Sequence, residues 1–390
     1  MSSAMNLLMV IPALDTGGAE WAFVRLANAL CARHEITAYV PYACDSKRAL
    51  LNAFDPAVRV WSLPLPHRWF HKLIYKLTLM FPKFDLEQRI HTCVLRMLHR
   101  VKNFAAVNPH LRGATMMVCR AFRTDGLPVV ETDHGDYALL NAEDPELARH
   151  QLLRERVDVV VCPSRANAAL VGRLGFQTTV IPYAMSLGAG SVVAELPRPF
   201  TFGLVARGVA EKGWAEALAA FRLLRQRVYE PVRLVFVGDG PFLNDLKKQA
   251  GADEGVIFAG YQAAPADWIA QFDVGLLPSC FTAESLPNAV IECLAQGKPV
   301  IATNVGGIPD MLMEDGEPCG VCIPLAADTG RADVTKLAEA MWDLFNDDNR
   351  RSALGRTAIE AVKRYSPGRC CEAYTECFTS VARSKEAQAA

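Results

Sequence analysis

The sequence predicts an α/β protein with two Rossmann-like domains, each built on a doubly wound parallel sheet. Short apolar runs alternate with segments of helix length along most of the 390 residues, a pattern typical of parallel sheets covered by helices on both faces. The chain is also long enough to hold two hydrophobic cores. The alternation lapses at residues 185–199, which contain glycines and end in prolines, so we expect the interdomain linker there.

Residues 1–184 form the first expected domain. Leu7–Ile11 reads as a buried strand, and a turn at Gly17 and Gly18 leads into a helix with apolar residues at helical spacing. Further strands are expected at Ile36–Val40, Val58–Ser62, Thr115–Cys119, Val129–Thr132, Val157–Cys162 and Thr178–Ile181.

Residues 200–366 repeat this alternation and form the second expected domain. Its strands are expected at Phe200–Val205, Arg233–Val237, Val256–Phe258, Val274–Leu277 and Pro299–Thr303. Helical spacing returns at Asp333–Phe345. Residues 367–390 form a last helix, which carries Tyr374, Phe378 and Val381 on one face.

Composition excludes several classes of protein. Hydrophobic residues make up 51% of the chain and charged residues 21%, with a net charge of −1, which fits neither a disordered protein nor a general nucleic-acid binder. Twelve cysteines without disulfide-scaffold density, and an N-terminus without a basic region, favour a reduced cytoplasmic compartment. No apolar run approaches the roughly 20 residues needed to cross a bilayer, so we expect any membrane association to be peripheral, at the inner face of the cell membrane.

The most informative motif contains two glutamates, Glu284 and Glu292, on either side of an expected helix start. Pro287 suits the first turn of that helix. The turn at Ser285 and Leu286 should therefore present unpaired backbone N–H groups, which attract a diphosphate without a metal. Alone, the two glutamates could be solvated carboxylates at helix ends. Glu292, however, lies in an otherwise apolar helix, where a carboxylate needs a partner.

Two cations, Arg207 and Lys212, follow the first expected strand of the second domain. Ligands of open α/β sheets bind outside the carboxyl ends of the strands, where an Arg and a Lys can stabilise a departing diphosphate. Taken alone, they could equally be two surface cations. The Gly17-Gly18 turn is also weak evidence alone, and it does not match the G-x-G-x-x-G fingerprint of dinucleotide sites.

Together these motifs resemble the signature of retaining glycosyltransferases of family 4. The matching segments are Gly17–Glu20, Arg207–Gly213, Glu284–Glu292, Gly297–Thr303 and Gly306–Pro309. The resemblance implies the GT-B fold, in which two Rossmann-like domains face a central cleft and the final helix, here residues 367–390, crosses back to the first domain. It also implies transfer of a sugar from a nucleotide-diphosphate donor.

The resemblance gives the matched residues of the second domain their expected roles. Arg207 and Lys212 would stabilise the leaving diphosphate, Glu284 would hold the sugar, and Glu292 would hold the ribose. The donor phosphates are expected at the turn formed by Ser285, Leu286 and Pro287.

In the first domain, the resemblance places Gly17 and Gly18 near the donor phosphates and gives His134 a contact with the transferred sugar. The candidates for acceptor contacts are Glu20, Asp133 and Asp136, although the two aspartates could also be loop caps. No Asp-x-Asp motif stands near a strand end, so neither a metal nor another cofactor is expected. One departure from the family is Tyr183-Ala184-Met185, where Asn-Gly is common; it bears on the hinge or the sugar pocket.

Residues 64–112 have the only local charge asymmetry, with nine Lys and Arg against two acidic residues and with interleaved aromatic side chains. This composition suits an anionic membrane surface, although a solvated helix face over an ordinary core is the alternative. With the resemblance, it predicts a glycan or lipid-linked glycan acceptor in lipopolysaccharide, O-antigen or capsule synthesis.

The activity we expect is metal-independent, retaining transfer of a hexose-type sugar, from a UDP-sugar first and a GDP-sugar next. Two other functions fit the same motifs. A GT-B sugar phosphorylase or nucleotide-sugar epimerase would share the fold and the anion site. A non-catalytic subunit of a glycan assembly complex would keep the fold without binding a donor.

Overall fold

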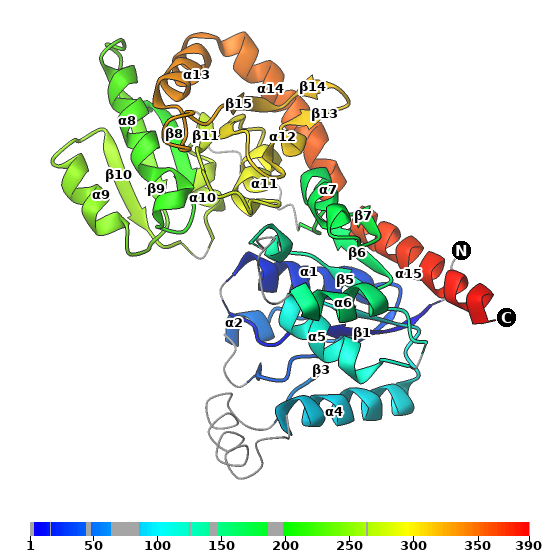
Figure 1. Ribbon diagram of the computed structural model, residues 1–390. Helices are drawn as coiled ribbons and strands as arrows, with labels where there is room; N and C mark the ends of the chain where they lie inside the picture. The colour runs from blue at the N-terminus through cyan, green and yellow to red at the C-terminus, as the bar shows by residue number, and fades with distance from the viewer. Residues whose placement is uncertain are drawn as a thin grey trace. The chain divides into compact units, whose positions relative to one another are not determined.

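The computed structural model describes residues 4–15, 17–43, 48–63, 86–124, 126–139, 147–185, 198–262 and 264–389. The chain divides into two compact units (Figure 1). Unit 1 contains Met1–Ser186 and Tyr365–Ala390, and unit 2 contains Leu187–Arg364. Most of the expected linker, residues 186–197, lies outside the described residues.

Unit 1 is built on parallel strands. Four of them pair in the order β3-β2-β1-β4, and three more in the order β5-β6-β7. Two isolated parallel bridges, Val107 with Val129 and His110 with Thr132, connect β4 to β5. The strands are β1 (Asn6–Val10), β2 (Glu35–Tyr39), β3 (Arg59–Trp61), β4 (Ala106–Pro109), β5 (Val130–Thr132), β6 (Val159–Cys162) and β7 (Thr178–Val180).

The terminal helix α15 (Pro367–Ala389) packs in unit 1, where its Tyr374 and Phe378 share a core with Phe23 and Leu30 of α1 (Gly18–Cys31). Figure 1 shows α15 in red beside the strands of this unit. Tyr374 also hydrogen-bonds Thr132 through the two hydroxyls, 3.0 Å apart. The other helical segments are α2 (Arg48–Leu51), α4 (Leu86–Lys102), α5 (Arg112–Ala121), the 3₁₀ helix η2 (Asp136–Leu139), α6 (Leu147–Arg156) and α7 (Arg165–Arg173).

The strand expected at Thr115–Cys119 is wrong, because this segment lies inside helix α5. Ala114, Val118 and Ala121 are buried at helical spacing, and this longer pattern outweighs the local β-branched and apolar run. The strand at this place in the order is β4 instead, a fully buried strand beside β1 that sequence reasoning missed.

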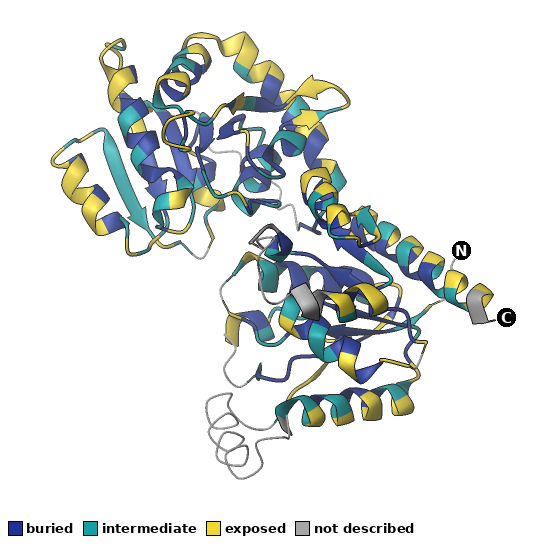
Figure 2. Cartoon of the chain, in the orientation of Figure 1, coloured by how far each residue is buried: buried dark blue, intermediate teal, exposed yellow. Residues whose placement is uncertain are grey.

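Unit 2 holds a six-stranded parallel sheet in the order β10-β9-β8-β11-β12-β15. Figure 2 shows mostly buried central strands, a partly buried edge strand β10, and helices with exposed outer faces. Chain order reverses between β8 and β11, and open α/β sheets bind ligands at such a switch point, outside the carboxyl ends of the strands. The strands are β8 (Phe200–Val205), β9 (Val232–Val237), β10 (Val256–Gly260), β11 (Val274–Leu277), β12 (Val300–Thr303) and β15 (Gly320–Ile323), plus the antiparallel hairpin β13 (Met313–Glu314) and β14 (Glu317–Pro318).

The helices of unit 2 enclose an aromatic core that includes Phe202, Trp214, Phe221 and Phe236. They are η3 (Ala210–Lys212), α8 (Trp214–Arg225), α9 (Leu243–Ala250), α10 (Ala266–Ile269), α11 (Asn288–Ala295), α12 (Ile308–Met311), α13 (Val334–Asn346), α14 (Asp348–Ala361) and η4 (Val362–Tyr365). Helix α13 confirms the expected helix at Asp333–Phe345, with Asp333 as its N-cap.

A buried carboxyl group, that of Glu131, lies at the centre of β5. The hydroxyls of Thr115 and Tyr137 donate to its two oxygens over 2.9 and 2.8 Å. Burial raises the pKa of Glu131 to about 8, and the hydrogen bonds only partly oppose this shift. The group is therefore mainly protonated at neutral pH in the folded protein, whereas in the unfolded chain it is ionised.

We predict that the free energy of unfolding falls as pH rises from about 4.5, the ordinary pKa of this group, to about 8. In this window the folded state keeps a proton that the unfolded state has lost, so linkage favours unfolding as pH rises. The uncharged isostere in Glu131→Gln removes that proton uptake. Chemical denaturation across this range should show the variant gaining stability over the wild type with pH, by on the order of a few kcal/mol.

The comparison with wild-type protein cancels the contribution of other titrating groups, among them Asp133, whose pKa burial raises to about 6. A stability difference between Glu131→Gln and wild type that is constant across the window would contradict a protonated Glu131.

Candidate active site

The loop after β8 carries both predicted cations and is anchored at two points. The indole N–H of the fully buried Trp214 donates to the backbone oxygen of Arg207 over 2.9 Å. Gly213 adopts a left-handed conformation (φ +79°), and a Cβ there would lie 2.0 Å from the backbone oxygen of Pro278. The loop after β8 is therefore pressed against the loop after β11, at the carboxyl edge of the sheet.

This close approach brings Lys212 and Glu284 together. The ammonium of Lys212 forms an ion pair with the Glu284 carboxylate, and the two side chains are only 13% and 5% exposed. The Ser279 hydroxyl donates to Oε1 of Glu284 over 2.8 Å. The Lys212 ammonium also lies 5.3 Å from the centroid of the Phe281 ring. The result is a cation largely removed from bulk water, held by one carboxylate and one aromatic face.

The backbone of Glu284 is fixed by the glycine pair that follows β12. Gly306 adopts φ +52°, and a Cβ at this position would lie 1.8 Å from the backbone oxygen of Glu284. The N–H of Gly307 donates to the same oxygen over 2.8 Å. These contacts explain the glycine at position 306, since a side chain there would displace the loop.

The turn that precedes α11 supplies the expected anion-binding groups. The helix begins at Asn288, with Pro287 as its N-cap rather than in its first turn, and Gly297 follows its end with φ +65°. Among the described residues, none accepts a hydrogen bond from the backbone N–H of Ser285 or Leu286. Two free N–H groups at the positive end of a helix form a favourable place for phosphate oxygens.

The other two predicted side chains of unit 2 are more accessible. Arg207 is exposed at the carboxyl end of β8, and no described residue bonds to its guanidinium group. Glu292 is partly buried on α11, one turn and a half along the helix from Pro287. Both lie on elements that start at the same edge of the sheet as the ion pair.

Sequence reasoning missed Arg331, which braces the loop that holds Lys212. Its guanidinium donates to the backbone oxygen of Ala210 over 2.8 Å and forms an ion pair with the buried Glu216 of α8. The hydrogen bond that Arg331 donates to the Glu216 carboxylate raises the pKa of Arg331 further, so this cation is permanently charged. No local signal in the sequence identifies it, because its partners are distant along the chain.

In unit 1, His134 follows β5 as predicted, next to a second histidine that sequence reasoning missed. Nε2 of His134 lies 2.9 Å from Nδ1 of His110. The Tyr183 ring stacks on His134 with centroids 5.2 Å apart, and the Tyr183 hydroxyl donates to the backbone oxygen of Asp133 over 3.0 Å. Tyr183 is the residue that departs from the family pattern, and it packs directly on the predicted sugar contact.

The contacts of Asp133 and Asp136 favour their interpretation as loop caps. Asp133 is buried and accepts from the N–H of Gly135 over 2.9 Å, and Asn167 donates to its other oxygen. Asp136 accepts from the backbone N–H of Arg112 over 3.3 Å. Asp136 is only partly buried, so a role for it as an acceptor contact stays a prediction.

The Gly17-Gly18 turn begins helix α1, with Gly17 as its N-cap. A Cβ on Gly17 would lie 2.3 Å from the carboxylate of Glu20, so this side chain folds back over the helix start. The glycine therefore leaves room for the first acidic side chain of the helix.

Within the described parts of the chain, no group of three or more His, Cys, Asp or Glu residues is arranged to hold a metal ion. Cys319 and Cys322, which have the spacing of a metal or redox pair, are both free thiols. No helix in the described ranges is long and apolar enough to span a bilayer.

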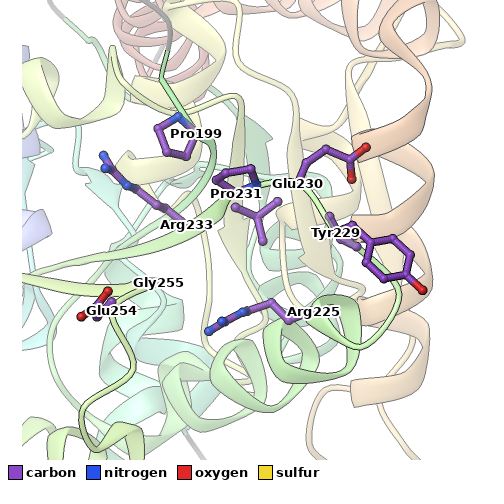
Figure 3. Close-up of a pocket in the computed structure, with 10 residues that line it drawn as sticks. Pro199, Arg225, Tyr229, Glu230, Pro231, Arg233, Glu254 and Gly255 are labelled. Carbon is purple, nitrogen blue, oxygen red and sulfur yellow. The ribbon is translucent and has the colours of Figure 1, made fainter.

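Figure 3 shows a pocket in unit 2 whose lining includes Arg225, Tyr229 and Glu254. Its lining also includes Pro199, Pro231 and Arg233, which stand at or just before the amino ends of β8 and β9. In a parallel sheet, this edge is opposite the carboxyl ends that carry Lys212 and Glu284. We therefore do not assign this pocket to the candidate active site.

Two family models match the chain in succession. The first, Glycosyltransferase Family 4, matches residues 16–187, and the second, Glycosyl transferases group 1, matches residues 199–347. Together they span both units and most of the sequence.

Part of the chain is similar in sequence to proteins named as glycosyltransferases. The lipopolysaccharide core biosynthesis glycosyltransferase LpsE of Rhizobium meliloti is 30% identical over 57% of this chain and 64% of its own length. A GDP-mannose-dependent phosphatidylinositol monomannoside mannosyltransferase of Mycobacterium tuberculosis is 33% identical over 43% of this chain and 46% of its own length. The chain thus aligns with less than two thirds of each of these relatives.

Solved structures share the fold over nearly the whole chain. HepE of Anabaena in complex with UDP superposes with a TM-score of 0.75 at 18% identity, covering 96% of this chain and all of that one. A glycosyltransferase from Rickettsia africae gives a TM-score of 0.79 at 15% identity, covering 97% and 99% of the two chains. Both neighbours have the GT-B fold, which confirms the expected fold class.

The glycine pair generates a stability prediction with a matched control. Gly306→Ala should destabilise unit 2 by roughly 3 kcal/mol or more, because the new methyl group meets the Glu284 backbone and the left-handed φ is unfavourable for alanine. Gly316→Ala should cost about 1–2 kcal/mol, the penalty of the conformation alone, because Gly316 also has a positive φ but no atom lies within 4 Å of its added Cβ.

The free energy of unfolding of both variants can be measured by denaturant titration, with hydrogen exchange of the unit 2 amides as the local readout. Equal destabilisation by the two substitutions would mean that the close approach at Glu284 does not constrain the loop.

Proposed function

Because the chain belongs to the group 1, family 4 glycosyltransferases, we propose that it transfers a hexose-type sugar from a nucleotide-diphosphate donor to an acceptor hydroxyl, with retention of configuration and without a metal. The observation that carries this proposal is the buried ion pair of Lys212 and Glu284 beside the free N–H groups of Ser285 and Leu286.

The electrostatics of this cluster suit a departing diphosphate. As the bond between sugar and phosphate breaks, negative charge grows on the leaving oxygen, and a fixed cation shielded from water stabilises it strongly. Lys212 is such a cation, and Arg207 adds a second, exposed charge on the same loop. The N–H groups before α11 hold the phosphate oxygens. These groups take the place of a divalent metal.

Glu284 has a place in the same proposal. In the absence of a donor its carboxylate balances the charge of Lys212. When a diphosphate arrives, phosphate oxygens compete for the ammonium, and Glu284 can accept a hydrogen bond from a sugar hydroxyl instead. Ser279 and the Gly306-Gly307 pair keep the carboxylate in position during this exchange of partners.

For the chemical step we propose front-side substitution. The acceptor hydroxyl attacks the sugar on the face from which the diphosphate leaves, the bond from sugar carbon to phosphate oxygen breaks, and the departing phosphate oxygen takes the hydroxyl proton. A side-chain base is not needed, and the incoming oxygen ends on the face of the leaving group.

We propose a UDP-sugar as donor, with a GDP-sugar next. The first choice is supported by the structural likeness to HepE with UDP bound, and the second by the GDP-mannose-dependent relative. Relatives in lipopolysaccharide core and phosphatidylinositol mannoside synthesis support a glycan or lipid-linked glycan acceptor.

Part of the basic segment supports a membrane surface as the place of reaction. Residues 64–85 lie outside the described structure, but helix α4 continues the segment. Its exposed residues recur at helical spacing and combine cations with apolar side chains, including Met97 at 46% and Val101 at 74% exposure. The stripe consists of Arg89, Cys93, Arg96, Met97, Arg100 and Val101. Such a face can attract anionic lipid headgroups.

The donor site predicts selective binding and loss of turnover in two variants. One nucleotide-diphosphate sugar among UDP-, GDP-, dTDP- and ADP-sugars should raise the melting temperature in the presence of a metal chelator. Lys212→Ala and Glu284→Ala should each reduce nucleotide release with that donor by roughly 10²–10³-fold. Lys248→Ala, at an exposed surface pair on α9, is the matched control and should leave turnover unchanged.

Near-normal turnover in both site variants would sink the assignment of the leaving-group site. Cleavage that depends on phosphate, or sugar isomerisation without acceptor, would replace transfer by phosphorylase or epimerase activity, and no response to any donor would favour a non-catalytic subunit.

The α4 stripe predicts binding to anionic vesicles. Sedimentation with phosphatidylglycerol-containing liposomes should exceed that with neutral phosphatidylcholine liposomes. Arg89→Glu/Arg100→Glu should lower the partition coefficient roughly tenfold or more, because each basic residue near the surface contributes about 1 kcal/mol. The control Lys247→Glu/Lys248→Glu makes the same charge change on α9 of unit 2. Equal, background-level sedimentation with both lipids would remove the membrane from the proposal.

A further inference from the structure

Three polar side chains of unit 1 are linked in series by hydrogen bonds. Two of them, Asn108 and His110, have no role in the transfer reaction proposed above. Asn108 and His110 stand at and just after the carboxyl end of β4, and His134 follows the neighbouring β5. The parallel bridge between His110 and Thr132 aligns the two strand ends. Nε2 of His110 lies 2.8 Å from Oδ1 of Asn108, and Nδ1 of His110 lies 2.9 Å from Nε2 of His134.

One backbone carbonyl determines which ring nitrogens of His110 and His134 carry a proton. The oxygen of Val130 can only accept, so the Asn108 atom that contacts it is the amide nitrogen, which also donates to the Thr132 hydroxyl over 3.0 Å. The amide oxygen then faces His110, whose Nε2 must carry a hydrogen. Because a neutral imidazole has a single N–H, Nδ1 of His110 is an acceptor, and His134 must donate to it from Nε2.

Both rings are neutral in the folded protein at physiological pH. Burial lowers the pKa of His134 to about 3. Burial, together with the neighbouring His134, lowers the pKa of His110 well below its ordinary value. The Phe23 ring meets His110 edge-on, with centroids 4.8 Å apart, and the Tyr183 ring stacks on His134, so each imidazole packs against an aromatic ring.

The last atom of this series of hydrogen bonds is Nδ1 of His134, which has no partner in the part of the chain that the structure describes. Nδ1 of His134 is buried, and no described residue forms a hydrogen bond with it. With the proton on Nε2, this nitrogen presents a lone pair. A buried acceptor without a partner is costly, and a ligand that donates a hydrogen bond relieves that cost.

We propose that Asn108 and His110 are positioning residues that hold the proton of His134 on Nε2, so that Nδ1 of His134 accepts a hydrogen bond from a hydroxyl of the sugar substrate. This inference rests on the proposed function and deepens it. At this point the site recognises a hydrogen-bond donor and rejects a group that only accepts, such as an ether, a carbonyl or a carboxylate. A sugar that lacks the hydroxyl leaves Nδ1 unpaired.

Removal of Asn108 shows why the relay matters. The two tautomers of a neutral imidazole differ mainly in the hydrogen bonds that their surroundings offer. Without the amide oxygen, His110 can carry its proton on Nδ1 and donate to Nε2 of His134. The proton of His134 then moves to Nδ1, and the lone pair that receives the hydroxyl becomes a donor.

The first experiment reads the tautomer directly. Long-range ¹H–¹⁵N spectra of the full chain with ¹⁵N-labelled histidine distinguish protonated from bare ring nitrogens, and His134→Asn assigns the His134 signals. In wild type we expect a bare Nδ1 and a protonated Nε2. Asn108→Leu should add a population with the proton on Nδ1, while the signals of His91, a buried histidine bonded to Tyr39 and Tyr42, should stay unchanged. A wild-type His134 protonated on Nδ1 would overturn the proposal.

A second variant covers the case in which Asn108→Leu does not fold. His110→Phe keeps an aromatic ring against Phe23 and removes the acceptor for His134. Thermal stabilisation by the free nucleoside diphosphate should be unchanged, because His110 is not among the residues proposed to bind it, while kcat for sugar transfer should fall roughly tenfold or more. An unchanged kcat would refute the positioning role.

The two readouts separate this inference from the proposed function. Failure of every nucleotide to bind the wild-type protein would overturn sugar transfer, and with it the sugar hydroxyl as the partner of His134. Normal transfer by a protein whose His134 carries its proton on Nδ1 would overturn the relay alone.

Discussion

The ion pair between Lys212 and Glu284 is the interaction on which the candidate active site depends. It joins the loop after β8 to the loop after β11, and the Gly306-Gly307 turn after β12 holds the second of these in place. A largely buried pair of charges adds little net stability, because the loss of hydration nearly cancels the attraction, yet loss of one partner is costly. The proposed role of this ion pair is therefore to hold the Lys212 ammonium in position for a ligand, rather than to stabilise the fold.

This constraint explains the close backbone approaches around the pair. Gly213 lies against Pro278, and Gly306 lies against Glu284, each where a Cβ would collide with a backbone oxygen. Arg331 holds the 3₁₀ turn that ends in Lys212. The two loops that carry Lys212 and Glu284 are thus each held by contacts outside the pair, which favours the preorganisation that stabilisation of a leaving group requires.

Around His134 in unit 1 most of the buried titratable groups are neutral, in contrast to the ion pair of unit 2. Around His134 the protein removes charge rather than storing it, because burial lowers the pKa of both histidines and raises that of the nearby Glu131 and Asp133. Direction there comes from the hydrogen bonds of neutral groups, set by the carbonyl of Val130 through Asn108. A charged diphosphate needs cations and N–H groups, whereas a neutral sugar hydroxyl needs one acceptor with its proton held elsewhere.

The sequence alone determined the fold class, most of the strands and the residues of the matched motifs, because periodicity, glycines and motif spacing are local properties. It failed at Thr115–Cys119, where helical burial of Val118 overrides local strand propensity. Only the tertiary structure decided that Lys212 meets Glu284, that Arg331 braces their loop, and that Asn108 and His110 direct His134. Each of these contacts joins separate elements at the carboxyl edge of a sheet. Strand order determines which loops lie side by side there, and local sequence does not encode strand order.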